Sequence, residues 1–246
     1  MIHKSINVLR EQIFAPNRSP FELEQSAKIE SLRERLTRQP HVFEMQDFGA
    51  GAPNDTRTWE QMKRGVRVQR DIRDLVLNSC RNVESGLWLM RIVGYLRPNF
   101  CVELGTCVGL SAAFIGSALD VNGSGVLHTI EADPTLKGMA ETNVGAIGVH
   151  SVLFHLGTFE AVLPSVLANS LVEFGFVDGH HTGRAMIRNT ELILSRAAGT
   201  ALVVLDDIMY STSTEDAWRT LCKIPEVKGS FVMGALGVLA FGAWAD

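Results

Sequence analysis

Two patterns of hydrophobic and polar positions divide this chain of 246 residues near residue 98. Before that point, apolar residues recur every three or four positions among charged ones, which predicts amphipathic helices. These helices cover residues 20–39, 59–80 and 85–96. From Phe100 onward, short β-rich runs alternate with helical segments, a pattern typical of βαβ units around a parallel sheet. We therefore expect a helical cap or lid over residues 1–97 and an α/β domain over residues 98–246.

Five apolar runs form the strands of the predicted sheet. Each is close to continuously apolar, as expected where helices cover both faces. The runs are FCVEL (100–104), VLHTIE (126–131), SVLFHL (151–156), VEFGFVD (172–178) and TALVVLD (200–206). Residues 229–244 then hold two more apolar runs separated by little more than Gly-Ala-Leu, which predicts a terminal antiparallel hairpin.

Two features of the predicted cap leave alternatives open. Residues 47–57 are rich in glycine and turn formers, so they form either a connector or a lid over a bound ligand. Arg64, Arg67 and Arg70 are spaced by three and would form one stripe on the predicted helix. This stripe is either a solvated face or a contact for an anionic substrate.

Composition narrows the partners and the location. The formal net charge is −4, so the chain lacks the basic character of nucleic-acid-binding proteins, and we expect no nucleic acid partner. Its four cysteines have neither metal-ligand spacing nor the density of a disulfide framework, which favours a reducing, cytoplasmic location. No segment offers about 18 uncharged apolar residues, so we expect no membrane span.

The loop after the first strand has the features of a nucleotide-binding turn. Gly105 and Gly109 follow the strand and lead into a helix whose N-terminus offers free N–H donors. Glu131 closes the second strand, where a carboxylate can accept hydrogen bonds from both hydroxyls of a ribose. The dinucleotide fingerprint is absent, because Cys107 stands where its second glycine would be. This absence argues against the alternative of an NAD-dependent oxidoreductase.

Three carboxylates follow the later strands. Asp178 ends one strand and Asp206 and Asp207 end the next, so all three should converge at one edge of the sheet. Crowded carboxylates repel one another, and a divalent cation such as Mg²⁺, Mn²⁺ or Ca²⁺ would relieve that repulsion. The alternative is that these side chains cap a helix or bond backbone amides.

Four motifs at these positions resemble those of class I S-adenosylmethionine (SAM)-dependent methyltransferases. Within that class, the chain is similar to small-molecule O-methyltransferases of the catechol type and of the macrocin sugar type. The motifs are VELGTCVGLS (102–111), TIEADP (129–134), FVDGHH (176–181) and LVVLDDI (202–208). The resemblance covers residues 98–246 and implies a Rossmann-like, seven-stranded, mostly parallel sheet with a terminal antiparallel hairpin.

The same resemblance implies the residues that contact SAM and its product S-adenosylhomocysteine (SAH). Gly105 and its neighbours would approach the methionine part, Glu131 the ribose, and Gly157 to Phe159 the adenine edge, although Phe159 could equally belong to the core. The full predicted cofactor set is Glu103, Gly105, Thr106, Gly109, Ser111, Glu131, Gly157, Thr158, Phe159 and Asp178.

At the predicted metal ligands and general base, the sequence is compared with two patterns, that of the catechol-type enzymes and that of the sugar enzymes. Asp178, Asp206 and Asp207 would bind Mg²⁺, with Asp207 departing from the Asp-Asn of the catechol type and resembling the Asp-Asp of the sugar enzymes. His180 and His181 stand where those families place a second acid or a lysine. A histidine can remove the proton of a methyl acceptor, and we expect His181 slightly ahead of His180 in this role. The alternative is a solvated or loop-holding histidine pair.

These observations predict a cytoplasmic enzyme that transfers a methyl group from SAM to a hydroxyl of a small molecule, assisted by a metal and a histidine base. A homodimer is possible on frequency alone. Three alternatives remain: a metal-independent N-, C- or carboxyl-methyltransferase, an NAD-dependent oxidoreductase, and a non-catalytic SAM-binding module. The acceptor is not encoded in any of these motifs.

Overall fold

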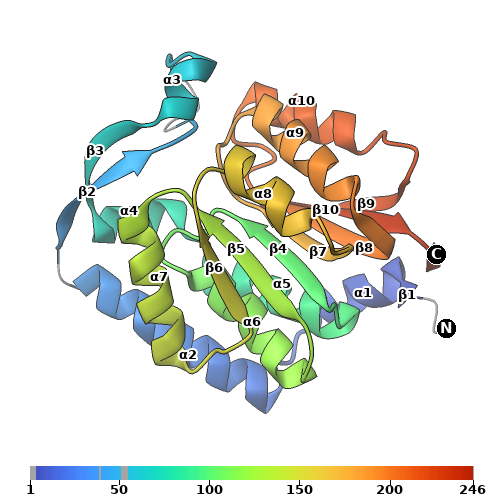
Figure 1. The fold of residues 1–246 in the computed structure, drawn as a ribbon. Helices are drawn as coiled ribbons and strands as arrows, with labels where there is room; N and C mark the ends of the chain where they lie inside the picture. Colours follow the sequence, from blue (N-terminus) through green and yellow to red (C-terminus); the bar gives the residue numbers. More distant parts are fainter. Residues whose placement is uncertain (1–3, 39, 51–54, 246) are drawn as a thin grey trace.

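The computed structural model describes residues 4–38, 40–50 and 55–245, and a seven-stranded sheet forms its centre (Figure 1). Its strands are β4 (Phe100–Leu104), β5 (Val126–Glu131), β6 (Val152–Leu156), β7 (Val172–Val177), β8 (Ala197–Leu205), β9 (Val227–Met233) and β10 (Leu236–Gly242). They lie in the order β6-β5-β4-β7-β8-β10-β9, and β10 runs antiparallel to both of its neighbours. The Rossmann-like α/β fold, the five predicted strands and the terminal hairpin are therefore confirmed.

Helices cover both faces of the sheet (Figure 1). One layer contains α5 (Val83–Leu96), α6 (Leu110–Asn122) and α7 (Pro134–Ile147), and the other contains α8 (Phe159–Leu167), α9 (Gly183–Leu194) and α10 (Thr212–Leu221). Alternate strand residues point to opposite layers, as the period of a strand requires. Cys101 and Val204 join the core on the α5–α7 side, whereas Val102 and Val203 join the core on the α8–α10 side.

The N-terminal helices share the first of these cores. They are α1 (Ile6–Ile13), α2 (Pro20–Arg38) and α4 (Ile72–Ser79). Leu9, Ile29 and Val76 are buried in the same hydrophobic cluster as residues of α5 and α6. The predicted helices over residues 20–39 and 85–96 are thus confirmed within two residues, while a domain boundary at residue 98 stays a prediction.

The prediction of one helix over residues 59–80 is wrong. This segment forms α3 (Trp59–Arg64), β3 (Val66–Asp71) and then α4. Gly65 ends α3 with a φ of +68°, a conformation that favours glycine. β3 then pairs antiparallel with β2 (Val42–Asp47), because the alternating residues Val66 and Val68 suit a strand.

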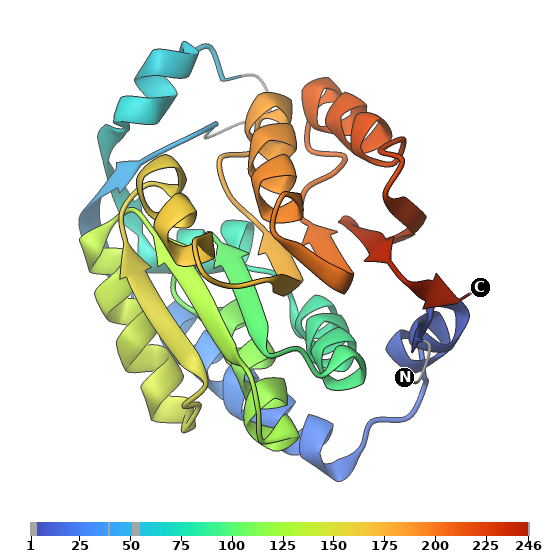
Figure 2. The same cartoon turned by 45° about the vertical axis from the view of Figure 1, so that its right-hand side comes forward.

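The predicted arginine stripe is therefore also wrong. Arg64 ends α3, whereas Arg67 and Arg70 lie on β3 and reach across the hairpin to carboxylates of β2. Arg67 lies 3.3 Å from Glu44 and Arg70 lies 3.3 Å from Asp47. The β2–β3 hairpin and α3 project from the main body beside α8, as Figure 2 shows.

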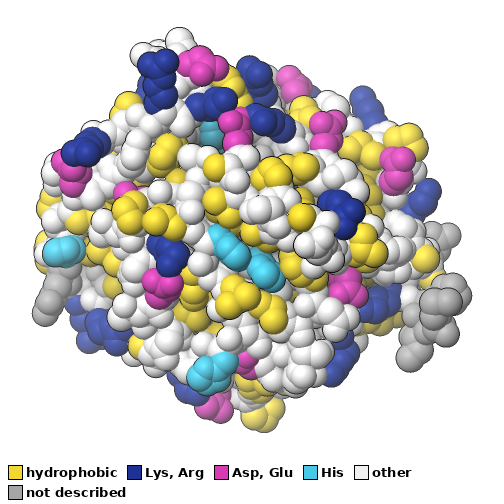
Figure 3. All heavy atoms as spheres, in the orientation of Figure 1, with side chains coloured by type: hydrophobic (Ala, Val, Ile, Leu, Met, Phe, Trp, Pro, Cys, Tyr) yellow, Lys and Arg dark blue, Asp and Glu magenta, His cyan; other side chains and the backbone are white. Residues whose placement is uncertain are grey.

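Two edges of the fold differ from the covered centre. Strand β6 is an edge strand, and its residues Leu153 and Leu156 are exposed, contrary to the expectation that both faces of every strand are covered. Beside them, His128 Nδ1 lies 3.0 Å from His155 Nε2, and Figure 3 shows histidine side chains among hydrophobic ones on this face. At the other side, β1 (Lys4–Ser5) pairs with β11 (Trp244–Ala245) and joins the two ends of the described chain.

Candidate active site

The glycine loop between β4 and α6 is confined on both sides by protein. Gly105 has a φ of +100°, and a Cβ there would lie 1.9 Å from the carbonyl oxygen of Asp178. Gly109 has a φ of +87°, and a Cβ there would lie 3.1 Å from Cβ of Ala140 in α7. Glycine is therefore required at both positions by backbone conformation and by close packing.

Glu131, at the end of β5, is held against this loop. Its Oε2 accepts the backbone N–H of Cys107 at 2.8 Å, and its Oε1 accepts the N–H of Asp133 at 3.0 Å. Burial raises the pKa of Glu131, while these backbone donors oppose the rise. Each carboxylate oxygen has a second lone pair, so the fixed carboxylate can still accept hydrogen bonds from a ligand.

A cavity of about 480 Å³ opens at the carboxyl ends of the central strands. Five of the predicted cofactor residues line it, namely Gly105, Glu131, Thr158, Phe159 and Asp178. The other five lie outside its lining: Glu103, Thr106, Gly109, Ser111 and Gly157. Of the glycine loop, Gly105 thus faces the cavity, whereas the predicted residues that do not line the cavity contact other parts of the protein.

Those contacts form a buried polar group beneath the glycine loop. Thr129 Oγ1 donates to Glu103 Oε2 at 2.5 Å and lies 2.5 Å from Thr106 Oγ1. Glu103 is fully buried, and this burial raises its pKa to about 7, against the effect of its hydrogen bonds with Thr129 and Ser111. Glu103 therefore supports the loop from inside the core.

Phe159, the first residue of α8, combines the two roles that the sequence left open. Its ring lines the cavity and also packs against the core on the α8–α10 side. A Cβ on Gly179 would lie 2.6 Å from this ring, so the chain passes directly over it. The ring therefore forms one wall of the cavity while remaining part of the core.

The predicted convergence of three carboxylates is present. Asp178 follows β7, and Asp206 and Asp207 follow β8, where the backbone N–H of Asp206 bonds the carbonyl of Val177 at 2.9 Å. Burial and then the neighbouring Asp206 raise the pKa of Asp178 well above its usual value. Burial also raises the pKa of Asp206, although Arg81 opposes that rise.

A guanidinium group lies at this cluster, where the sequence predicted a metal ion. Arg81 Nε donates to Asp206 Oδ2, and Arg81 Nη2 donates to Asp207 Oδ1. Among the residues that the structure describes, no group of three or more His, Cys, Asp or Glu side chains is arranged to hold a metal ion. The side chains as they stand therefore do not fit a bound Mg²⁺.

His181 and Asp207 form an imidazole–carboxylate pair that borders the cavity. His181 Nδ1 lies 3.1 Å from Asp207 Oδ2, and the His181 ring lies 5.4 Å from the ring of Tyr210. Burial disfavours the charge on Asp207, but the hydrogen bond with His181 and the charge of Arg81 outweigh it and lower the pKa of Asp207. An ionised carboxylate at Nδ1 keeps the proton there and leaves Nε2 as the acceptor.

His180 has a different environment. Its ring packs against Trp59 at an interplanar angle of 39°, with centroids 4.9 Å apart, and its Nδ1 lies 3.2 Å from Thr182 Oγ1. Its Nε2 is buried without a hydrogen-bond partner among the described residues, and burial lowers the pKa of the ring. The structure thus distinguishes the tandem histidines, because only His181 has a carboxylate partner among the described residues.

Backbone strain gathers around this cavity. Five non-glycine residues in the described chain have a positive φ, and four of them border the cavity: Cys107, His180, His181 and Asp207. Such conformations are costly outside glycine and persist where the surrounding structure enforces them. Their concentration here supports the assignment of a functional site.

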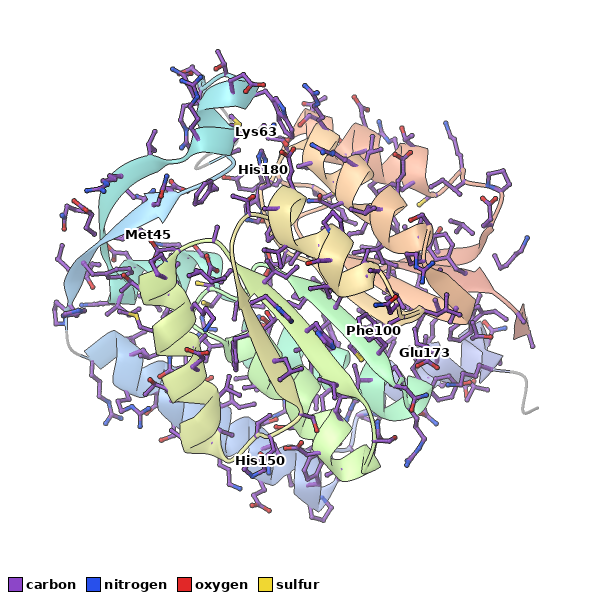
Figure 4. The ribbon with its side chains drawn as sticks, in the orientation of Figure 1. Met45, Lys63, Phe100, His150, Glu173 and His180 are labelled. Atoms are coloured by element: carbon purple, nitrogen blue, oxygen red, sulfur yellow. The ribbon has the colours of Figure 1, made fainter. Side chains whose placement is uncertain are left out.

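The β2–β3 hairpin and α3 close the cavity from above. Ala50 donates its N–H to the carbonyl of His180 at 3.1 Å, and the Arg184 guanidinium lies 4.3 Å from the Trp59 ring centroid. Lys63 of α3 lies 2.9 Å from Glu160 of α8, and Figure 4 shows Lys63 and His180 near each other. The connector or lid predicted over residues 47–57 thus reaches the site, although residues 51–54 lie outside the described part.

Three site residues were absent from the sequence prediction: Arg81, Trp59 and Arg184. Arg81 lies between α4 and α5, and its carboxylate partners are 125 and 126 residues away in sequence. Trp59 stood on a predicted amphipathic helix, where an aromatic residue indicates packing. No local signal marks any of the three as part of the site. Tyr210 also lines the cavity, whereas Trp218 packs against Gly237.

Comparison with known proteins relates part of this chain to one protein family. Residues 102–208 match the family model described as a methyltransferase domain. This part of the chain is similar to methyltransferase domains. This match includes the glycine loop, Glu131, the tandem histidines and the three aspartates. The resemblance to methyltransferases noted in the sequence is therefore confirmed.

Curated relatives of the methyltransferase domain are named as O-methyltransferases. The proteins called transmembrane O-methyltransferase from Propithecus coquereli and Homo sapiens are each 32% identical over 132 residues. The alignment covers 51% of this chain and 47% and 44% of those relatives, so the chain spans about half of their length. No helix among the described residues is long and apolar enough to cross a membrane.

Solved structures show the same fold around the methyltransferase domain. The O-methyltransferase TomG from Streptomyces achromogenes, solved with SAM, has a TM-score of 0.57 and 20% identity, covering 68% of this chain and 82% of TomG. An O-methyltransferase from Bacillus cereus, solved with SAH, has a TM-score of 0.60 and 11% identity, covering 97% of both chains. At these identities the likeness concerns the fold.

Proposed function

We propose that this protein is a SAM-dependent methyltransferase that acts on a hydroxyl group of a small molecule. The observation that carries the proposal is the His181–Asp207 pair on the wall of the same cavity as Glu131 and the glycine loop. A cofactor-binding edge and a positioned base in one cavity are what methyl transfer to oxygen requires. The names of the curated relatives and of TomG support the choice of oxygen as acceptor.

The proposed cofactor position follows from the residues that line the cavity. Glu131 would accept hydrogen bonds from the ribose hydroxyls, and Thr158 and Phe159 would border the adenine. Gly105 and Asp178 would lie beside the methionine part. When bound, SAM supplies an electrophilic methyl group on a sulfonium sulfur. Neither Gly105 nor Gly109 has room for a side chain, so at these two positions the glycine loop presents only its backbone to this edge of the cavity.

The proposed role of His181 is that of general base. Nε2 would accept the acceptor hydroxyl proton as the oxygen forms its bond to the methyl carbon, and the carbon–sulfur bond electrons would remain on sulfur. Asp207 would hold the imidazole through Nδ1 and stabilise the imidazolium that forms. His180, packed against Trp59, would instead hold α3 in place over the cavity.

The proposal is tested first by titrating the purified protein with SAH by calorimetry. We expect saturable binding that Glu131→Ala weakens by about tenfold or more, since hydrogen bonds to a charged group are strong. Glu141→Ala is the matched control, because Glu141 is a carboxylate of α7 paired with Lys137 on the surface. Absence of SAH binding to the wild type would refute the proposal.

The test of oxygen as acceptor uses SAM with a labelled methyl group and a panel of phenols, catechols and sugars. Product with the label on oxygen is the expected result. Label on nitrogen, carbon or a carboxylate would replace the proposal with the corresponding alternative. Cytoplasmic location and a homodimer remain predictions that these measurements do not address.

A further inference from the structure

Every carboxylate oxygen of Asp206 and Asp207 has a donor within the protein. Asp206 Oδ1 accepts the backbone N–H of Asp207 at 2.6 Å, and Asp206 Oδ2 accepts Arg81 Nε. Asp207 Oδ1 accepts Arg81 Nη2, and Asp207 Oδ2 faces His181 Nδ1 at 3.1 Å. A divalent cation would need several of these oxygens at once as ligands.

Arg81 is suited to hold this place. Its guanidinium bridges two carboxylates with two different nitrogens; the Asp206 side chain is fully buried, and the Arg81 side chain is 27% exposed. Buried charges are tolerated when they are paired and hydrogen-bonded, and guanidinium groups form the strongest such pairs with carboxylates. The segment that carries Arg81 is fixed at its next residue, because Asn82 caps α5 by accepting the N–H of Ser85 at 2.9 Å.

We propose that Arg81 is the resident cation of the Asp206–Asp207 cluster and takes the place of a divalent metal ion. It acts as a positioning residue: its contact fixes Asp207, and Asp207 fixes the imidazole of His181. The inference rests on the proposed function, because it concerns the same cavity. It replaces the predicted metal-assisted reaction with one in which the chain itself supplies the positive charge.

The proposal predicts that the wild type binds Mn²⁺ weakly and that Arg81→Ala binds it more tightly. In the wild type, Arg81 competes with any divalent cation, so Mn²⁺ should not bind at micromolar concentrations. In Arg81→Ala, two carboxylate oxygens lose their donors and become available as ligands. Mn²⁺ affinity should therefore rise by about tenfold or more, as expected when a competing charge is removed from a carboxylate cluster.

The experiment measures Mn²⁺ binding by electron paramagnetic resonance, without cofactor, in the wild type, Arg81→Ala, Arg81→Lys and Arg188→Ala. Arg81→Lys keeps a positive charge and should remain closer to the wild type. Arg188→Ala is the matched control, because Arg188 also lines the cavity but pairs with Glu160, away from the aspartates. Mn²⁺ binding by Arg188→Ala should equal that of the wild type.

Two results would overturn the proposal. One is micromolar Mn²⁺ binding by the wild type, and the other is an Arg81→Ala variant that folds and gains no Mn²⁺ affinity. If Arg81→Ala does not fold, the wild-type and Arg81→Lys measurements still decide between the outcomes. SAH calorimetry on the same samples keeps the two proposals apart, since loss of SAH binding refutes the proposed function and leaves the Mn²⁺ result unaffected.

Discussion

His181 Nδ1 and Asp207 Oδ2 lie 3.1 Å apart, although both residues have a backbone conformation with positive φ. The two strained positions face each other across the ends of β7 and β8. Strain of this kind persists where the surrounding contacts enforce it. Here Arg81 donates to Asp207, and Ala50 donates its N–H to the carbonyl of His180, the residue before His181.

Replacing His181 tests this pair directly. His181→Gln keeps the size and polarity of the side chain but cannot take up a proton, so the turnover number should fall by about 10²–10⁴-fold. SAH binding should stay within about twofold of the wild type, because the imidazole does not belong to the proposed cofactor edge. His128→Gln is the control, since His128 lies on the open face of the sheet with His155 as its partner. Equal turnover numbers for His181→Gln and the wild type would disprove the role of His181 as general base.

The two glycines 105 and 138 should respond in opposite directions to alanine. At Gly105 the φ of +100° and the carbonyl of Asp178 leave no room for a Cβ, so Gly105→Ala should destabilise the fold by roughly 3 kcal/mol or more. At Gly138, inside α7, a Cβ would meet nothing within 4 Å, so alanine should stabilise by about 0.5–1 kcal/mol. Chemical denaturation of both variants gives the comparison, and a neutral Gly105→Ala would contradict the described loop.

Glu103 should make stability depend on pH. Its pKa is raised from 4.5 to about 7 by burial, so the folded state binds the proton more tightly than the unfolded state. The stability that this proton contributes is present below pH 4.5 and is lost as pH rises through about 7. Glu103→Gln cannot titrate and therefore lacks this pH dependence. Between pH 4.5 and pH 8, the free energy of unfolding of the wild type should fall by roughly 3 kcal/mol relative to that of the variant. The measurement is urea unfolding of both proteins at pH 4.5 and pH 8, and parallel curves would contradict the assignment.

Trp59 should govern acceptor binding more than cofactor binding. Its ring contacts His180 and Arg184 and holds α3 over the cavity. Trp59→Ala should raise the KM of the acceptor by about tenfold, because it removes an aromatic wall and a cation–π contact. Arg67→Ala, which breaks an exposed ion pair with Glu44 on the same hairpin, is the control and should leave the KM unchanged. A change in SAH affinity alone in Trp59→Ala would show that the hairpin covers the cofactor instead.

The core of the fold could be predicted because its signals are local. Each parallel strand is one apolar run, and the two runs of the terminal hairpin are separated by too few residues for a crossover. The sequence of residues 59–80 predicts a single helix because the charged residues of β3 fit a helical spacing as well as a strand. The one sequence signal for a break in this segment is the glycine at position 65, which adopts a φ of +68° in the structure.

The site was less accessible from the sequence for a physical reason. Strand ends could be located, so the meeting of Asp178, Asp206 and Asp207 followed from parallel topology. Arg81 could not be included, because its position depends on how α4 and α5 pack under the sheet. Without Arg81, three carboxylates have no visible partner, and a metal ion was the natural expectation.

The short junction between α4 and α5 serves both halves of the cavity. Cys80 places its sulfur 3.9 Å from that of Cys107 in the glycine loop, while the adjacent Arg81 reaches the aspartates beside His181. Consecutive residues therefore touch the proposed cofactor side and the proposed acceptor side of the cavity. An insertion or deletion at this junction would shift both contacts together. Any redesign of the protein must therefore keep the number of residues between α4 and α5.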